Sequence, residues 1–299
     1  MGEDLADGRA LARVRSSLLA WYADDHRDFP WRRTTDPYAV LVSEVMLQQT
    51  QASRVAERFP TFMHRFPTAA SLAEAPEASV LAAWSGLGYN RRALSLRRAA
   101  TEVMKHGWPT DVAGLERLPG IGPYTARAVA SLAFGEPVGV VDTNVRRWLV
   151  RRFGLPTDGP PRALQSLSDL LAGSGSATDA APWTHATMEF GAAICTPRNP
   201  RCEACPISAD CPSRSLATVV PVPRQATFAG SDRAHRGAIL RALSRAPDHR
   251  MTMRAARDLV PSGVVGRVLT GLERDRLLHR SGGRLVLGGA TEAAATIGR

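Results

Sequence analysis

All four cysteines of this 299-residue chain lie in one run, CTPRNPRCEACPISADC, at Cys195, Cys202, Cys205 and Cys211. The spacing is Cys-x6-Cys-x2-Cys-x5-Cys. Four thiolates so close along the chain can converge on one metal centre, which would fold a loop that has little apolar core of its own. Zinc also accepts four thiolates, but structural zinc sites usually show two close pairs and this run has one. Spacing alone therefore leaves an iron–sulfur cluster and zinc open.

The chain carries a strong positive charge. It has 38 Lys and Arg against 28 Asp and Glu, a net charge of +10 and a pI of about 10.5. Such a charge favours a polyanionic partner, most often nucleic acid, because cationic side chains bind phosphates and release counterions. Only Lys105 is a lysine, so an arginine-rich codon usage also contributes. Composition by itself leaves nucleic-acid binding open.

Nothing in the sequence indicates a membrane protein. Hydrophobic residues make up 44% of the chain, and no run of ~18 apolar residues occurs, the length that a membrane span needs. The N-terminal stretch has mixed charges and lacks the apolar core of a signal peptide. We expect a cytoplasmic, nucleoid-associated protein, in a compartment where thiols stay reduced.

Apolar residues recur at helical spacing along most of the chain, as in residues 4–22 and roughly Thr184–Cys195. Proline and glycine separate these segments, and no segment before the C-terminal region alternates with period two. The pattern predicts a mostly α-helical fold.

The C-terminal region differs from the rest. A Pro- and Thr-rich stretch after Cys211 is typical of a linker. Beyond it, the pattern indicates a helix, a short helix, a third helix and two short strands around Ser281-Gly282-Gly283, an order typical of a winged-helix module. Residues 232–299 hold 13 arginines against 6 acidic residues, a net charge of +7. This charge fits a solvated basic face or a surface that binds DNA or protein.

A glycine-rich turn stands in LPGIGPYTARAVASLAFG, between two helical segments. Gly120, Ile121 and Gly122 form the turn, and its amides would point outward at the start of the following helix, where a phosphate is favoured. In a basic chain this pattern indicates a helix–hairpin–helix that binds the DNA backbone. A helix pair packed for stability alone would show the same pattern.

Two carboxylates are candidates for chemistry. Glu44 lies among Val42, Val45 and Met46, and an acid in such surroundings would have a raised pKa that suits proton donation. An ordinary surface glutamate on an amphipathic helix is the alternative. Asp142, in VVDTNVRRWLVRRFG, occupies a helix N-cap position, a structural role that does not exclude a catalytic one.

Five segments together resemble the MutY-type adenine glycosylases of the helix–hairpin–helix, endonuclease III-like superfamily. They run in family order over roughly residues 25–213: FPWRRTTDPYAVLVSEVMLQQTQ, WSGLGYNRRALSLRRAA, LPGIGPYTARAVASLAFG, VVDTNVRR and MEFGAAICTPRNPRCEACPISADC. SEVMLQQTQ is the most specific of them. In that family the four cysteines hold a [4Fe–4S] cluster, so the resemblance favours iron–sulfur over zinc.

The resemblance also implies a domain organisation. We expect two helical lobes with a cluster loop, followed by the winged-helix-like module. The expected boundaries are 1–213 for the glycosylase region (helical barrel lobe about 26–135; cluster lobe about 1–25 and 136–213), 214–231 for the linker and 232–299 for the module.

Residue by residue, the resemblance assigns the chemistry. Glu44 matches the general acid that protonates adenine at N7, and Asp142 matches the carboxylate that stabilises the oxocarbenium-like sugar. Asn144 and Tyr124 match residues that line the same site.

Other positions match residues that handle the duplex and the base. Gln49 and Tyr89 match side chains that wedge into DNA while the target base is flipped out. Glu189 matches a residue that hydrogen-bonds the flipped base. Three further residues match the wall of the base pocket: Arg27, Phe29 and Trp31.

Tyr124 stands where bifunctional relatives carry a lysine that forms a Schiff base with the sugar. The sole lysine, Lys105, lies outside every matching motif. We therefore expect a monofunctional glycosylase, a monomer that acts on double-stranded DNA with a mismatched or damaged base pair and removes adenine opposite 8-oxoguanine or guanine.

Departures from the family leave two alternatives. Asn90 follows Tyr89 where the family usually has a second tyrosine, and Thr184 and His185 stand near the expected base pocket. These residues motivate a thymine or uracil mismatch glycosylase, which the QQTQ string disfavours. A DNA-binding regulator that uses the cluster as a redox sensor and the winged helix for sequence readout is the alternative of another class, which the presence of both Glu44 and Asp142 disfavours. The family's usual Nudix-like C-terminal domain, which reads the 8-oxoguanine opposite the adenine, has no counterpart among the ~85 residues after the cysteine run. Either the winged-helix-like module takes over the reading of the opposite base, or that selectivity is weaker here.

Overall fold

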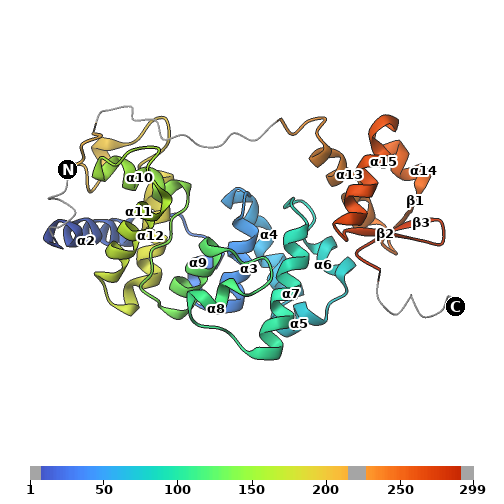
Figure 1. Cartoon of the computed structure of the whole chain (residues 1–299), viewed down its shortest axis with the longest axis horizontal. Coiled ribbons are helices and arrows are strands. Elements are labelled where there is room, and N and C mark those ends of the chain that lie inside the picture. The colour runs from blue at the N-terminus through green and yellow to red at the C-terminus, as the bar shows by residue number, and fades with distance from the viewer. Residues whose placement is uncertain (1–7, 215–226, 291–299) are drawn as a thin grey trace. The chain divides into compact units, whose positions relative to one another are not determined.

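The computed structural model describes residues 8–214 and 227–290, most of which are helical (Figure 1). The α-helices are α2 (Gly8–Asp24), α3 (Pro37–Leu47), α4 (Ala52–Arg65), α5 (Ala69–Glu74), α6 (Glu77–Ala83), α7 (Arg91–His106), α8 (Val112–Glu116), α9 (Pro123–Phe134), α10 (Thr143–Phe153), α11 (Pro161–Gly173), α12 (Ala180–Ala193), α13 (Asp232–Arg245), α14 (Met253–Leu259) and α15 (Ser262–Arg274). Short 3₁₀ helices are η1 (Pro30–Arg33), η2 (Ala177–Asp179) and η3 (Cys202–Ala204). The prediction of a mostly helical fold is confirmed.

The chain divides into two compact units. Unit 1 comprises Met1–Glu44 and Trp108–Arg224, and unit 2 comprises Val45–Gly107 and Gln225–Arg299. The division passes through α3. The predicted lobes group the chain differently, and their boundaries stay a prediction. Most of the predicted linker lies outside the described residues, as do the first seven and last nine residues of the chain.

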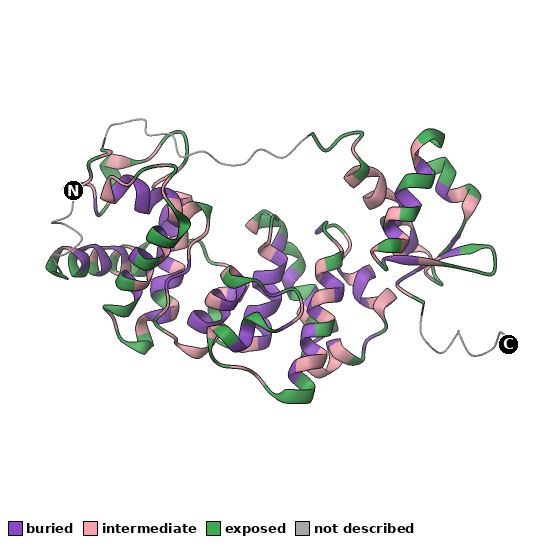
Figure 2. Cartoon of the chain, in the orientation of Figure 1, coloured by how far each residue is buried: buried purple, intermediate pink, exposed green. Residues whose placement is uncertain are grey.

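Four helices, α2, α10, α11 and α12, enclose the core of unit 1. Figure 2 shows buried residues along α10 and α12. Phe190 packs edge-on against Trp21 and Trp148, with ring centroids 5.8 and 5.9 Å apart. Gly191 lets α12 approach the start of α10, because a Cβ at this position would lie 2.6 Å from the Asn144 carbonyl oxygen. The core thus fixes the first turn of α10 against α12.

The start of α10 follows from its sequence. Asp142 is the N-cap, and its carboxylate accepts from the amides of Asn144 and Val145 at 2.8 and 2.6 Å. Gly154 ends the helix in the left-handed conformation, with φ of 62°. The cap position predicted from the sequence is confirmed.

In unit 2, α4–α7 form a helical body in which Phe62 packs edge-on against Trp84 at 5.8 Å. The C-terminal module follows with α13, α14, α15 and a three-stranded antiparallel sheet. Its strands are β1 (Arg250–Thr252), β2 (Leu278–Ser281) and β3 (Arg284–Leu287), in the order β1-β3-β2, with Leu278 opposite Leu287.

The two strands expected around Gly282 and Gly283 are present as β2 and β3, which those glycines join. Strand β1 was not predicted, because it has three residues and only Met251 among them is buried, too few to show alternation. Within the described ranges, no helix has the length and apolar character needed to cross a membrane.

Candidate functional site

Glu44 lies on α3 and is almost fully buried, with 3% of its surface exposed. Its Oε2 atom has no hydrogen-bond partner among the described residues. Burial and the nearby Asp142 carboxylate raise the pKa of Glu44 from 4.5 to about 7, against a hydrogen bond from Tyr124 that lowers it. Glu44 is therefore an acid that still holds a proton near neutral pH.

Asp142 experiences different surroundings. Besides the two backbone amides, the side-chain amide of Asn144 donates to its Oδ2 at 2.8 Å. Burial raises the pKa of Asp142, while these donors and the charge of Arg147 lower it. The pKa of Asp142 is raised overall, but three N–H groups favour its ionised form, whereas Oε2 of Glu44 has no such donor among the described residues.

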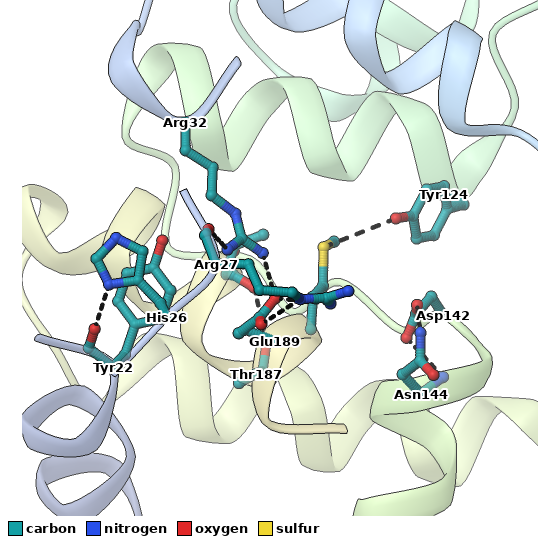
Figure 3. Close-up of polar contacts among 11 residues, drawn as sticks. Tyr22, His26, Arg27, Arg32, Tyr124, Asp142, Asn144, Thr187 and Glu189 are labelled. Carbon is teal, nitrogen blue, oxygen red and sulfur yellow. Dashed lines mark hydrogen bonds and ion pairs between the residues drawn. The ribbon is translucent and has the colours of Figure 1, made fainter. Parts of the chain in front are cut away.

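Tyr124 and Asn144 complete the group around these two carboxyls. Tyr124, in the first turn of α9, points its hydroxyl toward the sulfur of Met188 at 3.9 Å (Figure 3). Burial and the two carboxylates raise the pKa of Tyr124 well above its usual value of 10.0, so it is a neutral donor. Arg147 donates to Asn144 Oδ1 at 3.0 Å and fixes the orientation of that amide. The structure therefore brings together all four residues that the sequence assigned to catalysis.

Glu189 on α12 is held by two arginines (Figure 3). Arg27 binds it through two hydrogen bonds, at 2.6 and 2.9 Å, and Arg32 donates at 2.8 Å. Glu189 is 1% exposed, and the hydrogen bonds from these arginines hold its pKa below the usual range despite burial. Arg32 was not singled out from the sequence, where it is one of two adjacent arginines in PWRR.

Aromatic rings surround the two arginines. Phe29 stacks on Trp31 with centroids 4.7 Å apart, and both Arg27 and Arg32 lie 5.1 Å from the Phe29 ring. Predicted pocket residues Arg27, Phe29, Trp31 and Glu189 thus form one group.

The two residues that depart from the family pattern take different positions. Thr184 is buried and shares a 2.7 Å hydrogen bond with Ser131 of α9, within the protein interior. His185 stacks on Tyr22 at 6.3 Å, and burial together with Arg32 lowers its pKa to about 3. His185 is therefore a neutral ring beside the Glu189 group, whereas Thr184 serves packing between α9 and α12.

The predicted hairpin joins α8 to α9. The Ile121 side chain is buried, and its amide donates to the Leu118 carbonyl at 3.1 Å. Gly120 has φ of 80°, a left-handed conformation that favours glycine. Gly122 caps α9, and a Cβ there would meet nothing within 4 Å, so the backbone is open to a close approach. This geometry fits the expected contact with a DNA phosphate.

Gln49 and Tyr89, the predicted wedge residues, both belong to unit 2. Each is a non-glycine residue in the left-handed region, with φ of 56° and 45°. Such backbone strain persists only where the surroundings enforce it, and it is often found at functional sites. Tyr89 is 42% exposed.

The guanidinium of Arg92 stabilises both the turn that contains Gln49 and the turn that contains Tyr89. It donates to the carbonyls of Val45 (2.7 Å) and Met46 (3.0 Å) before Gln49, and to those of Leu87 (3.2 Å) and Gly88 (3.1 Å) before Tyr89. Its charge also faces the Trp84 and Tyr89 rings. Sequence analysis missed this residue, since no local pattern shows that one arginine bridges two distant turns.

The four cysteines line one hollow of about 420 Å³, including the space at its open mouth. Apolar side chains of Trp148, Phe190, Ile194 and Ile207 form part of its wall. All four are free thiols of intermediate exposure.

Buried arginines of α10 hold the cysteine loop. Arg147 donates to the Cys195 carbonyl at 2.7 Å, and Arg152 donates to that of Asp210 at 2.8 Å. Arg151 donates to the Thr196 carbonyl at 2.7 Å and lies 3.5 Å from the Cys195 sulfur. These arginines are 2–7% exposed. A cationic, partly apolar hollow with four thiols fits an anionic iron–sulfur cluster.

Comparison with known proteins identifies the family. Residues 42–172 match the HhH-GPD superfamily of base excision DNA repair proteins, and residues 195–211 match the iron–sulfur binding domain of endonuclease III. An adenine DNA glycosylase of Mycobacterium tuberculosis (strain ATCC 25618 / H37Rv) is 41% identical over 286 residues, 92% of this chain and 93% of the relative. This chain belongs to the adenine DNA glycosylase family.

Other comparisons agree with this family assignment. An adenine DNA glycosylase of Mycolicibacterium smegmatis is 44% identical over 233 residues, 75% of this chain and 78% of that relative. A solved thermostable thymine-DNA glycosylase has a TM-score of 0.63 and 29% identity, covering 70% of this chain and 99% of its own. Because so little of the chain lies outside the M. tuberculosis match, that match extends into the C-terminal module.

The family also decides between the two metal centres that the cysteine spacing left open. Cys195, Cys202, Cys205 and Cys211 are the ligands of a [4Fe–4S] cluster. When bound there, the cluster would cross-link residues 195–211, which follow α12 and include η3, and would give this loop a fixed shape.

Proposed function

We propose that this chain is a monofunctional adenine DNA glycosylase that removes adenine mispaired with 8-oxoguanine or guanine. The names of its relatives support adenine as the base, and the family supports base excision repair. The observation that carries the proposal is Glu44, a buried acid with a pKa of about 7 that faces Asp142 and Tyr124.

In this proposal Glu44 donates its proton to N7 of the flipped adenine. The N-glycosidic bond then breaks, and its electron pair leaves with the base. Asp142, which its N–H donors keep ionised, stabilises the positive charge that develops on the sugar. A water molecule adds its hydroxyl to C1′, and the proton it loses replaces the one that Glu44 gave away.

Access to the base requires base flipping, because the duplex hides it. Gln49 and Tyr89 would enter the stack, held in position by Arg92. Gly120, Ile121 and Gly122 would bind the DNA backbone near the start of α9. The flipped base would lie near Phe29 and Trp31. Half of the Arg27 side chain is exposed, 53%, so Arg27 can release Glu189 to the base more easily than buried Arg32 can.

No strand cleavage is expected from this chain. Tyr124 has no amine and therefore cannot form a Schiff base with the sugar. Lys105 lies exposed on α7 and pairs with Glu102 at 3.1 Å. Because both catalytic carboxyls come from one chain, we expect the protein to act as a monomer at the nucleoid.

Base release from duplexes that carry A:8-oxoG, A:G, T:G and U:G tests the proposal. We expect release of adenine, with an abasic site and an intact strand. Release of thymine or uracil without adenine would overturn it in favour of the mismatch alternative that Asn90, Thr184 and His185 motivated. Strand cleavage that persists in Lys105→Ala with a blocked N-terminal amine would contradict the monofunctional mechanism.

A further inference from the structure

The C-terminal module contacts α6 and the start of α7, the two helices that flank residues 84–90. We call this segment, which contains Tyr89, the wedge turn. Helix α13 and strand β3 of the module pack on α6. The amide of Gly289 donates to the Glu77 carboxylate, at the start of α6, at 2.9 Å. At Gly288, φ is 92°, and a Cβ would lie 3.3 Å from that of Glu77, so the contact needs a glycine there.

A second contact joins the module to the residue that begins α7. Asp275 of the module accepts an ion pair from Arg236 and lies 3.7 Å from Arg91. Arg91 follows Tyr89 by two positions. Asp275 has an exposed side-chain fraction of only 15%, and this shielding favours the pairing. The two contacts hold the module on both sides of the wedge turn.

These contacts bring Arg233, in the first turn of α13, next to Tyr89. Its Nη1 donates to the Tyr89 hydroxyl at 3.3 Å. The hydroxyl is the tip of the side chain that the proposed function inserts into DNA. Arg233 begins within hydrogen-bonding distance of the Tyr89 hydroxyl. When the Tyr89 ring enters the base stack, the Arg233 guanidinium must therefore lie at the surface of the duplex.

We propose that the C-terminal module is part of the DNA-binding surface and that Arg233 binds a backbone phosphate beside the base step that Tyr89 enters. The proposal rests on the proposed function, which assigns the wedge role to Tyr89. A guanidinium suits this task, because its fork of N–H donors matches phosphate geometry. The net charge of +7 over residues 232–299 favours the same partner.

Binding measurements test this role without relying on catalysis. Arg233→Ala and Arg245→Ala would each be made in the Glu44→Gln background. Each would be titrated at several salt concentrations against two labelled duplexes, one fully matched and one with adenine opposite 8-oxoguanine. Arg245 is the matched control, because it is exposed on the same helix, about 18 Å away at 1.5 Å per residue.

We expect Arg233→Ala to weaken binding several-fold, equally for matched and mismatched duplexes. The slope of log Kd against log salt concentration should fall by about 1, the effect of one lost phosphate contact. Arg245→Ala should leave the slope unchanged. An unchanged slope in Arg233→Ala overturns the proposal, as do equal losses in both variants, which would indicate a diffuse charge effect. Failure of the proposed function would appear differently, as wild-type protein that releases no adenine from any duplex.

Discussion

Two glutamates of unit 1, Glu44 and Glu189, are equally buried yet have opposite electrostatics. Glu44 is 3% exposed and Glu189 is 1% exposed. Burial raises the pKa of Glu44 to about 7, and the Asp142 carboxylate that it faces adds to the rise. Glu189 faces two guanidinium groups, and its pKa falls. Burial favours the protonated form of both glutamates, and only at Glu189 do neighbouring guanidinium groups outweigh it.

This difference shows which of the two glutamates can donate a proton near neutral pH. Glu189 stays charged, and Arg27 and Arg32 fix its position, so it is not a proton donor at neutral pH. Glu44 holds a proton at neutral pH at the expense of stability, because its ionised form is poorly solvated. Substitutions of each residue should therefore have opposite effects on folding.

The largest expected effect is on catalysis. Glu44→Gln should lower the single-turnover rate of adenine release by roughly 1000-fold, within the range for loss of a general acid. Glu102→Gln, on the exposed part of α7, is the control and should retain the wild-type rate. A Glu44→Gln rate within tenfold of the control would remove Glu44 from the mechanism.

A smaller effect concerns the stability of the same variant. The folded-state pKa of Glu44 lies above the unfolded value, so ionising it costs stability as pH rises from 4.5 to about 7. Gln does not titrate. Glu44→Gln should therefore gain stability over the wild type with rising pH, by about 2 kcal/mol more at pH 8 than at pH 5. Urea unfolding at the two pH values measures this, and a gain that does not depend on pH would contradict the raised pKa.

An effect of similar size but opposite sign is expected for the second glutamate. Glu189→Gln should destabilise the fold by about 2 kcal/mol at pH 7, because it leaves the buried Arg32 without its counter-charge. This value is less than for a fully buried pair, since Arg27 is half exposed. The folded-state pKa is lowered, so the loss should be constant above pH 4.5 and shrink below it. Urea unfolding extended to pH values below 4.5 tests this: the stability change of Glu189→Gln should vary with pH below 4.5, whereas that of Glu44→Gln should vary above it.

Much of the fold was predictable from local patterns. Asp142 as an N-cap, the turn at Gly120 and the hairpin strands at Gly282 depend on residues a few positions apart, so the sequence shows them directly. The family motifs also placed Glu44, Asp142, Asn144 and Tyr124 in one site. Strand β1 escaped prediction because its pairing with β3 depends on distant residues.

The arginines that hydrogen-bond separate segments of the chain, Arg92, Arg147 and Arg151, were not predictable in the same way. Arg92 is one of many arginines in the sequence, and its role depends on carbonyl groups in two separate turns. Arg147 and Arg151 look like the exposed face of a basic helix, but the cysteine loop covers them. Their functions depend on which chain segments fold over them.

The sequence by itself determined which chemical groups this protein has and in what order: the cysteine run, the hairpin glycines and the two carboxylates. Only the tertiary structure decided the protonation of Glu44, the pairing of Glu189 and the place of Arg233 beside Tyr89. The physical reason is that desolvation and Coulomb interactions depend on distance and burial in space, which residues far apart in the chain acquire only when it folds.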